Sequence, residues 1–295
     1  MPLAPGPIIP RKQLAAELRR LRAEKNLRLE QVAKELMVST SKLSRLENAQ
    51  GSPQVRDVRD LIKLYEIEGT PTAEKLMRLA RNARRQGWWN DYSFDTSGAA
   101  TDIDAHVEYE SEASIARVYT IPFIPALLQT KEYGDALYRS LEPWRRDHDV
   151  DQLVRLRLRR QEVLSSRGSK PRLELIAVAH ESCLHQLVGS KQIMAAQLDA
   201  LDNAYERRNV ELRILPFSAA PPFTSNCMWA HFEFGDALDR DLVGVETHAG
   251  FRYTDLFDQV AQYRRHYDEL VRRSLGLDAS RALIKAMAER WKQST

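Results

Sequence analysis

The sequence contains little cysteine and no long apolar run. Only 2 of its 295 residues are cysteine, which excludes a disulfide framework and indicates a reducing compartment. No apolar stretch approaches the roughly 20 residues that a membrane-spanning helix requires. The N-terminal segment MPLAPGPIIPRK lacks the charged and apolar regions of a signal peptide. These absences predict a cytoplasmic protein without a membrane partner.

The motifs of common catalytic and metal sites are also missing. The sequence has no Gly-rich phosphate loop, no nucleophile elbow, and no paired C-x-x-C or H-E-x-x-H spacing. His180, Glu181, Cys183 and His185 lie within six residues, but core packing and surface contacts explain them better than a metal or a nucleophile. A redox pair of Cys183 and Cys227 is the alternative. We therefore expect no enzyme activity, no metal and no cofactor.

Positive charge is concentrated near the N-terminus. Residues 1–85 hold 18 Lys and Arg against 10 Asp and Glu, whereas the remaining residues hold 26 against 31. A basic head on an acidic body is typical of a protein whose nucleic-acid contacts are confined to the head. A length of 295 residues also suits two domains better than one.

Changes in hydrophobic period divide the chain into four segments. We expect, in order, a disordered arm, a helix-turn-helix domain, a linker and an α/β domain, over residues 1–10, 11–86, 87–106 and 107–295. The linker begins with Trp88 and Trp89, which should dock against protein because two adjacent indoles are costly to leave in water. From Val107, apolar and acidic residues alternate, and this pattern predicts a half-buried strand.

Residues 29–48 have the pattern of two short helices around a turn. Ala33 is small enough to let the helices cross closely, and Leu43 and Leu46 share a face that turns inward. Ser39 can cap the second helix by accepting a bond from a free backbone N–H. The exposed part of that helix then carries short polar donors and a basic side chain, which suits readout in a major groove.

Residues 13–66 resemble the lambda-repressor/Cro-like (Xre-type) regulators, which share a five-helix DNA-binding fold. The inward leucines and the S-R-L-E-N ending at residues 44–48 match that family. Two positions depart from it, because Met37 stands where the turn usually has Gly and Ala49 stands where Gly usually follows the recognition helix. A left-handed residue is therefore unfavourable at Met37. We expect Asn48 to take the left-handed conformation after the recognition helix.

The resemblance implies roles for individual residues. The side chains expected to face base edges are Thr40, Ser41 and Arg45. The side chains expected to hold phosphates are Arg28, Ser39, Lys42, Ser44 and Asn48. Arg22 should pair with Glu47 as a structural ion pair. Because this fold usually pairs two half-sites, the expected partners are a second copy of the chain and a palindromic operator of double-stranded DNA.

The remainder of the chain resembles a C-terminal domain of unknown function that many bacterial regulators of this type carry. Its marks are Trp88-Trp89, Leu127-Leu128-Gln129-Thr130 with Tyr133, Arg157-x-x-Arg160-Gln161, Glu181-x-x-Leu184, Gln197-Leu198-x-x-Leu201, Leu215-Pro216-Phe217 and Glu246. The two resemblances together cover about residues 13–290. They imply a body that binds a small-molecule effector or a small protein encoded beside the regulator.

A candidate pocket for that ligand or partner combines aromatic residues with charge at a strand end. Its residues are Trp88, Trp89, His231, Glu246 and His248. The sequence thus predicts a multidomain chain with an all-α five-helix head and a mixed α/β body that dimerises. Its predicted function is sequence-specific transcriptional regulation. The alternative is a protein-interaction adaptor, such as an antitoxin-like or anti-regulator partner, whose DNA contact is secondary.

Overall fold

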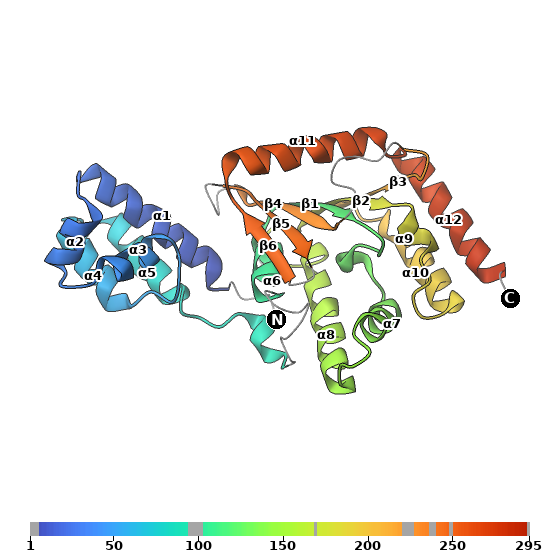
Figure 1. Cartoon of the computed structure of the whole chain (residues 1–295), viewed down its shortest axis with the longest axis horizontal. Coiled ribbons are helices and arrows are strands. Elements are labelled where there is room, and N and C mark those ends of the chain that lie inside the picture. The colour runs from blue at the N-terminus through green and yellow to red at the C-terminus, as the bar shows by residue number, and fades with distance from the viewer. Residues whose placement is uncertain are drawn as a thin grey trace. The chain divides into compact units, whose positions relative to one another are not determined.

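The chain forms two compact units, which divide between Asn90 and Asp91. This computed structural model describes residues 6–93, 103–167, 170–219, 227–235, 240–247 and 250–293. The first unit, here called the head, is helical, and the second, the body, is built on a mixed sheet (Figure 1). The predicted fold class, an all-α head followed by a mixed α/β body, is confirmed.

The head consists of five helices around one apolar core. They are α1 (Ile8–Glu24), α2 (Leu29–Glu35), α3 (Thr40–Glu47), α4 (Val55–Leu64) and α5 (Pro71–Asn82). Leu18, Val58, Leu61, Tyr65 and Leu76 lie fully buried at its centre. Four of these side chains come from α1, α4 and α5, and Tyr65 directly follows α4. The short helices α2 and α3 add the buried Val32, Ala33 and Leu43 to the same core.

Helix α1 begins at Ile8, inside the segment of residues 1–10 that was expected to be a disordered arm. The expected disorder through Pro10 is therefore wrong for residues 8–10. Ile9 and Pro10 are buried, and Arg11 Nε donates a hydrogen bond to the carbonyl of Ala83 at 3.0 Å. Proline is tolerated in a first helical turn because that turn has no partner for the missing N–H. Packing against the end of α5 thus extends the helix.

Each of the first four helices ends in a left-handed residue that is not glycine. These residues are Asn26, Met37, Ala49 and Glu66, with φ between 51° and 57°. After each of them, the next N–H bonds a carbonyl five residues back, as from Val38 to Ala33 at 2.9 Å. The apolar residue that follows, Leu27, Val38 or Ile67, packs on the core in three of the four cases. This is the Schellman arrangement, in which the buried residue fixes the turn.

Two expectations about these turns are wrong. Met37 does take the left-handed conformation, at φ 51°, and after α3 it is Ala49, at φ 57°, that does so. Asn48 instead keeps a φ of −102°. At Met37, packing of the following Val38 on the core offsets the local cost of roughly 1–2 kcal/mol for a left-handed non-glycine residue. At Ala49, the following residue is the exposed Gln50, whose N–H donates to the Arg45 carbonyl at 2.8 Å.

The body contains a six-stranded sheet in the order β3-β2-β1-β4-β5-β6. The strands are β1 (Ile115–Thr120), β2 (Glu174–His180), β3 (Val210–Leu215), β4 (Trp229–Glu233), β5 (Leu242–Thr247) and β6 (Gly250–Thr254). β1 is parallel to β2 and β2 to β3, whereas β1–β4, β4–β5 and β5–β6 are antiparallel. The mixed sheet therefore changes direction between β1 and β4.

Helices cover both faces of the sheet (Figure 1). α11 (Phe257–Arg273) lies along one face, where Tyr267 and Leu270 pack on Tyr119, Val178 and Trp229. The other side carries α6 (Ile103–Glu112) and α8 (Asp147–Arg160). The remaining α-helices are α7 (Lys131–Leu141), α9 (Ser182–His185), α10 (Lys191–Ala204) and α12 (Leu277–Gln293).

The strand predicted to begin at Val107 is wrong, because this segment belongs to helix α6. Residues 106–111 are all buried, including the acidic Glu108 and Glu110. Glu110 accepts two hydrogen bonds from the buried guanidinium of Arg160, each 2.9 Å long. The alternation of acidic and apolar residues suggested that the acidic side chains face solvent. The sequence pattern did not reveal Arg160, the residue that neutralises Glu110, because it lies 50 residues away.

Side-chain amides, two of them from distant parts of the chain and one from the segment itself, bind the irregular segment that follows β1. Gln197 of α10 donates to the Leu128 carbonyl at 2.9 Å and accepts from the Thr130 N–H at 2.7 Å. Gln161 donates to the Gln129 carbonyl at 2.6 Å, and Gln129 donates to the Ile124 carbonyl at 2.6 Å. These amides take the place of ladder bonds that a segment outside the sheet cannot make.

Replacing Met37 or Ala49 with glycine should each raise the free energy of unfolding by about 1 kcal/mol, because glycine adopts positive φ without a steric cost. Urea unfolding of the full chain, followed by circular dichroism, measures the change. Ala23→Gly, at an exposed position in α1, should lower the stability by about 1 kcal/mol. Destabilisation by both Met37→Gly and Ala49→Gly would contradict the strain argument.

Gln197→Leu should lower the free energy of unfolding by about 2–5 kcal/mol, because a buried N–H and a buried carbonyl each lose their partner. Gln192→Leu, at an exposed position of the same helix, is the matched control and should change it by less than about 0.5 kcal/mol. Equal effects of the two variants in thermal unfolding would show that the amide bonds carry no stability.

Candidate nucleic-acid interface

Helix α3 presents one polar face to solvent. Its N-cap residue Ser39 accepts a hydrogen bond from the Lys42 N–H at 3.2 Å, which starts the helix. Leu43 and Glu47 are buried and Leu46 packs partly buried on the same core. Because these residues turn inward, one face of this eight-residue helix remains for contact with another molecule.

The ion pair between Arg22 and Glu47 fixes the orientation of that face. Arg22 Nε and Nη2 donate to the two carboxylate oxygens of Glu47 at 2.8 and 2.9 Å. Nη1 of the same guanidinium donates to the Leu27 carbonyl at 2.9 Å, at the end of α1. Glu47 is 3% exposed, and its bond to Arg22 raises the pKa of the arginine. One side chain thus ties α3 to α1 and to the turn that follows α1.

The three side chains predicted to read bases, Thr40, Ser41 and Arg45, are all exposed on α3. Arg45 makes no ion pair or side-chain hydrogen bond within the described part of the chain, so its guanidinium can form new contacts. A guanidinium is the side chain that most often makes a bidentate contact with guanine. The exposed face of α3 is therefore chemically suited to base recognition.

The predicted phosphate ligands differ in how much their side chains are already engaged. Arg28 is exposed at the start of α2, where its backbone N–H binds Gln31 Oε1 at 2.7 Å. Asn48 Nδ2 turns back onto α3 and donates to the Ser44 carbonyl at 2.9 Å. Ser39 caps the helix with its hydroxyl oxygen. Arg28 is therefore the freest cation of the predicted set apart from the reader Arg45.

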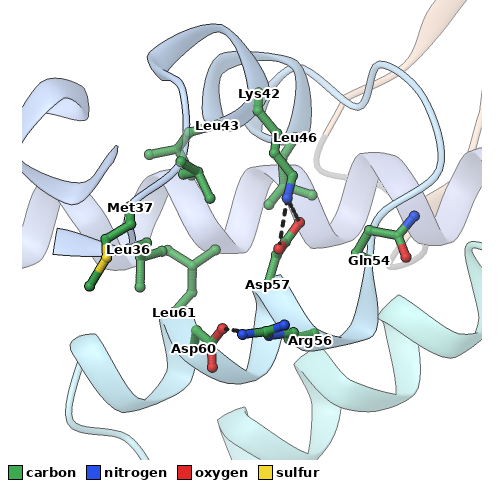
Figure 2. A pocket seen from close by; sticks show the side chains of 11 residues that line it. Leu36, Met37, Lys42, Leu43, Leu46, Gln54, Arg56, Asp57, Asp60 and Leu61 are labelled. Carbon is green, nitrogen blue, oxygen red and sulfur yellow. Dashed lines mark hydrogen bonds and ion pairs between the residues drawn. The ribbon is translucent and has the colours of Figure 1, made fainter. Parts of the chain in front are cut away.

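Lys42 forms an ion pair with Asp57, a contact that the sequence did not predict. Its ammonium lies 2.9 Å from Oδ1 and 2.7 Å from Oδ2 of Asp57 in α4 (Figure 2). The pair stands over a groove of about 530 Å³ between the helix-turn-helix turn, α3 and α4. Asp57 lies in the first turn of α4, where an acidic residue is expected simply to complement the helix dipole. The spacing of residues therefore gave no signal of its contact with Lys42.

Two family models match the chain. Residues 13–74 match a model described as Helix-turn-helix domain. Residues 103–286, more than half of the chain, match Domain of unknown function (DUF5753). The chain belongs to this family. No curated protein and no solved structure matches it. The helix-turn-helix domain supports DNA binding and transcriptional regulation, and favours a regulator over an enzyme.

The part of this DUF5753 protein that the structure describes has neither a membrane-spanning helix nor a metal-binding cluster. None of its helices is long and apolar enough to span a membrane. Within the same ranges, no three His, Cys, Asp or Glu residues gather to hold a metal ion. Cys183 is buried, and burial raises the pKa of its thiol to about 12. The thiol is therefore protonated at neutral pH and poorly nucleophilic.

In the body, the two described residues of the candidate effector pocket, His231 and Glu246, lie on opposite faces of the sheet. Trp88 and Trp89 belong to the head, where their rings meet edge to face at 5.9 Å. His231 is opposite Val243 in the β4–β5 pairing. Since side chains alternate along a strand, Glu246 points to the face of the sheet opposite His231. His248 lies outside the described residues.

His231 is a buried core residue. Its side chain is fully buried, and its Nε2 lies 3.4 Å from Oδ2 of Asp241. Burial lowers the pKa of the imidazole, and the nearby Asp241 and Glu233 oppose that shift. Glu246, at the end of β5, is exposed. The two residues therefore occupy different environments. They were predicted to share a pocket because they lie on paired strands.

Glu47→Gln should lower the free energy of unfolding by about 2 kcal/mol, because it leaves the Arg22 charge without its carboxylate. The loss stays below that of a fully buried pair because Arg22 retains 23% of its side-chain exposure. Glu24→Gln, which removes an exposed pair with Arg20, should change stability by less than about 0.5 kcal/mol. Urea unfolding checks both, and equal losses would contradict the special role of the Arg22–Glu47 pair.

Proposed function

We propose that this protein is a sequence-specific regulator that reads double-stranded DNA with α3. The observation that carries the proposal is the exposed polar face of α3, with Thr40, Ser41 and an unengaged Arg45, held in place by the Arg22–Glu47 pair. An α-helix of this kind fits a major groove, where each base pair presents a distinct pattern of donors and acceptors. The role implies that the protein works in the cytoplasm.

In this proposal, the polar side chains of the head divide into two groups. Thr40, Ser41 and Arg45 contact base edges and select the sequence. The residues proposed to contact phosphates and set the register are Arg28, Ser39, Ser44 and Asn48. Lys42 was predicted with them, but its ammonium is engaged by Asp57, and it is treated separately below. Phosphate contacts contribute affinity for every sequence, whereas base contacts discriminate among sequences.

We propose that the regulator acts as a homodimer on a palindrome. An eight-residue helix reaches only a few base pairs, and two heads on half-sites one helical turn apart double the length that is read. The body would dimerise and bind a small-molecule effector or a small partner protein, which would change the spacing of the heads. Its support is the sequence resemblance and the separate core of the body.

A protein-interaction adaptor is the second candidate. The observation that favours it is the exposure of large apolar side chains on the body, with Trp144 at 78%, Phe217 at 58% and Phe257 at 80%. Exposed aromatic residues of this kind are enriched where proteins bind other proteins. In the adaptor, these residues would hold a partner and the head would contact DNA only weakly.

Selection of full-length protein on a pool of random duplexes tests the proposed function. We expect a palindrome to be enriched, and Arg45→Ala to lose about 1–3 kcal/mol of discrimination at one base position, or about 5- to 150-fold. Arg78→Ala removes the same charge from an exposed position in α5 and should leave the selected sequence unchanged.

Two outcomes would contradict parts of this proposal. An unchanged base preference in Arg45→Ala would reject α3 as the reading helix as assigned. Failure to enrich any sequence, even at low salt where phosphate contacts are strongest, would reject the regulator and favour the adaptor.

A further inference from the structure

The ammonium of Lys42 is held by both oxygens of one carboxylate. The distances to Asp57 are 2.9 and 2.7 Å, and Figure 2 shows the two side chains reaching toward each other from α3 and α4. The Lys42 side chain is 43% exposed and that of Asp57 is 18% exposed. The cation is therefore accessible to solvent but is directed toward α4.

The helical position of Lys42 places it at the flank of the proposed reading face. Successive residues turn by about 100°, so Lys42 lies between the exposed side, which carries Ser41 and Asn48, and the buried side, which carries Leu43 and Leu46. A helix with its side chains is about 10–12 Å wide and a major groove is about 12 Å wide. A flanking side chain of a docked α3 therefore faces a phosphate wall.

We propose that Asp57 limits the DNA affinity of the head by holding Lys42 away from that phosphate wall. This inference rests on the proposed function. The carboxylate and a phosphate compete for the same ammonium, so the head makes one fewer phosphate contact than its basic residues would allow. Because phosphate contacts are blind to sequence, Asp57 lowers binding to all duplexes alike and leaves base preference to the other side chains.

A second acidic residue on the same groove separates this effect from general charge repulsion. Asp60 lies on α4 one turn after Arg56, and its carboxylate is 3.8 Å from that guanidinium, with no bond to α3 (Figure 2). Removing its charge changes the field of the head as removing the charge of Asp57 does. It does not release Lys42. Asp60→Asn is therefore the matched control for Asp57→Asn.

The test measures binding of full-length variants to a mixed-sequence duplex of about two helical turns across a range of salt concentrations. Asp57→Asn should make the slope of log K against log salt more negative by about 0.9. If the two proteins bind equally at about 1 M salt, this slope corresponds to binding that is about eightfold tighter at about 0.1 M salt. Asp60→Asn should leave the slope unchanged. Lys42→Met alone should also leave it unchanged, and the gain should vanish in the double variant Lys42→Met/Asp57→Asn.

Several results would overturn the inference. Weaker binding by Asp57→Asn would show that the carboxylate positions Lys42 for DNA contact. A loss of slope in Lys42→Met alone would show that Lys42 already binds a phosphate. A gain that survives in the double variant would show that only the charge of Asp57 matters. Asp57→Asn and Lys42→Met each remove one partner of a partly exposed ion pair, so neither should change the stability of the protein much.

A readout without DNA separates this inference from the proposed function. Acetylation of the free protein by acetic anhydride, followed by mass spectrometry, should modify Lys42 faster in Asp57→Asn than in the unsubstituted protein or in Asp60→Asn. An unchanged rate would overturn the hold of Asp57 on Lys42. If neither the unsubstituted protein nor Asp57→Asn binds any duplex, the proposed function is rejected. Faster acetylation of Lys42 in Asp57→Asn would then still support the hold of Asp57 on Lys42.

Discussion

The contact between Arg22 and Glu47 is the interaction on which the geometry of the head depends. A carboxylate buried this deeply is costly unless it is paired, and the desolvation of both groups offsets much of their attraction. The pair is therefore better understood as fixing an arrangement than as a source of stability. Its guanidinium also binds the Leu27 carbonyl, so α1, α3 and the turn between α1 and α2 meet at one side chain.

The body uses the same physical device with other residues. Arg160 neutralises Glu110 in the interior, and Gln197 satisfies two backbone groups of the segment after β1. An unpartnered polar group in either place would cost about 1–3 kcal/mol. Several marks of the family resemblance, such as Gln129, Gln161 and Gln197, are thus explained by backbone support. They need not line a ligand site.

Competition for one cation connects the structure of the head with its proposed function. A recognition helix contributes base contacts and phosphate contacts together, and the second kind raises affinity for every sequence. In this head, a carboxylate from α4 meets the cation at the flank of α3. The neighbouring helix therefore influences how the reading helix meets DNA, although Asp57 is not on that helix.

Local chemistry made several features readable from the sequence alone. The cap at Ser39, the inward leucines of α3 and the basic bias of the head depend on residues close together in the chain, and so the helical head and its exposed polar helix were predictable. Only the tertiary structure showed that residues 103–112 form a helix, in which the buried Glu110 is neutralised by Arg160 from 50 residues away. It also decided that Asp57 meets Lys42. Each of these outcomes depends on which distant groups pack together, and spacing along the chain does not encode that choice.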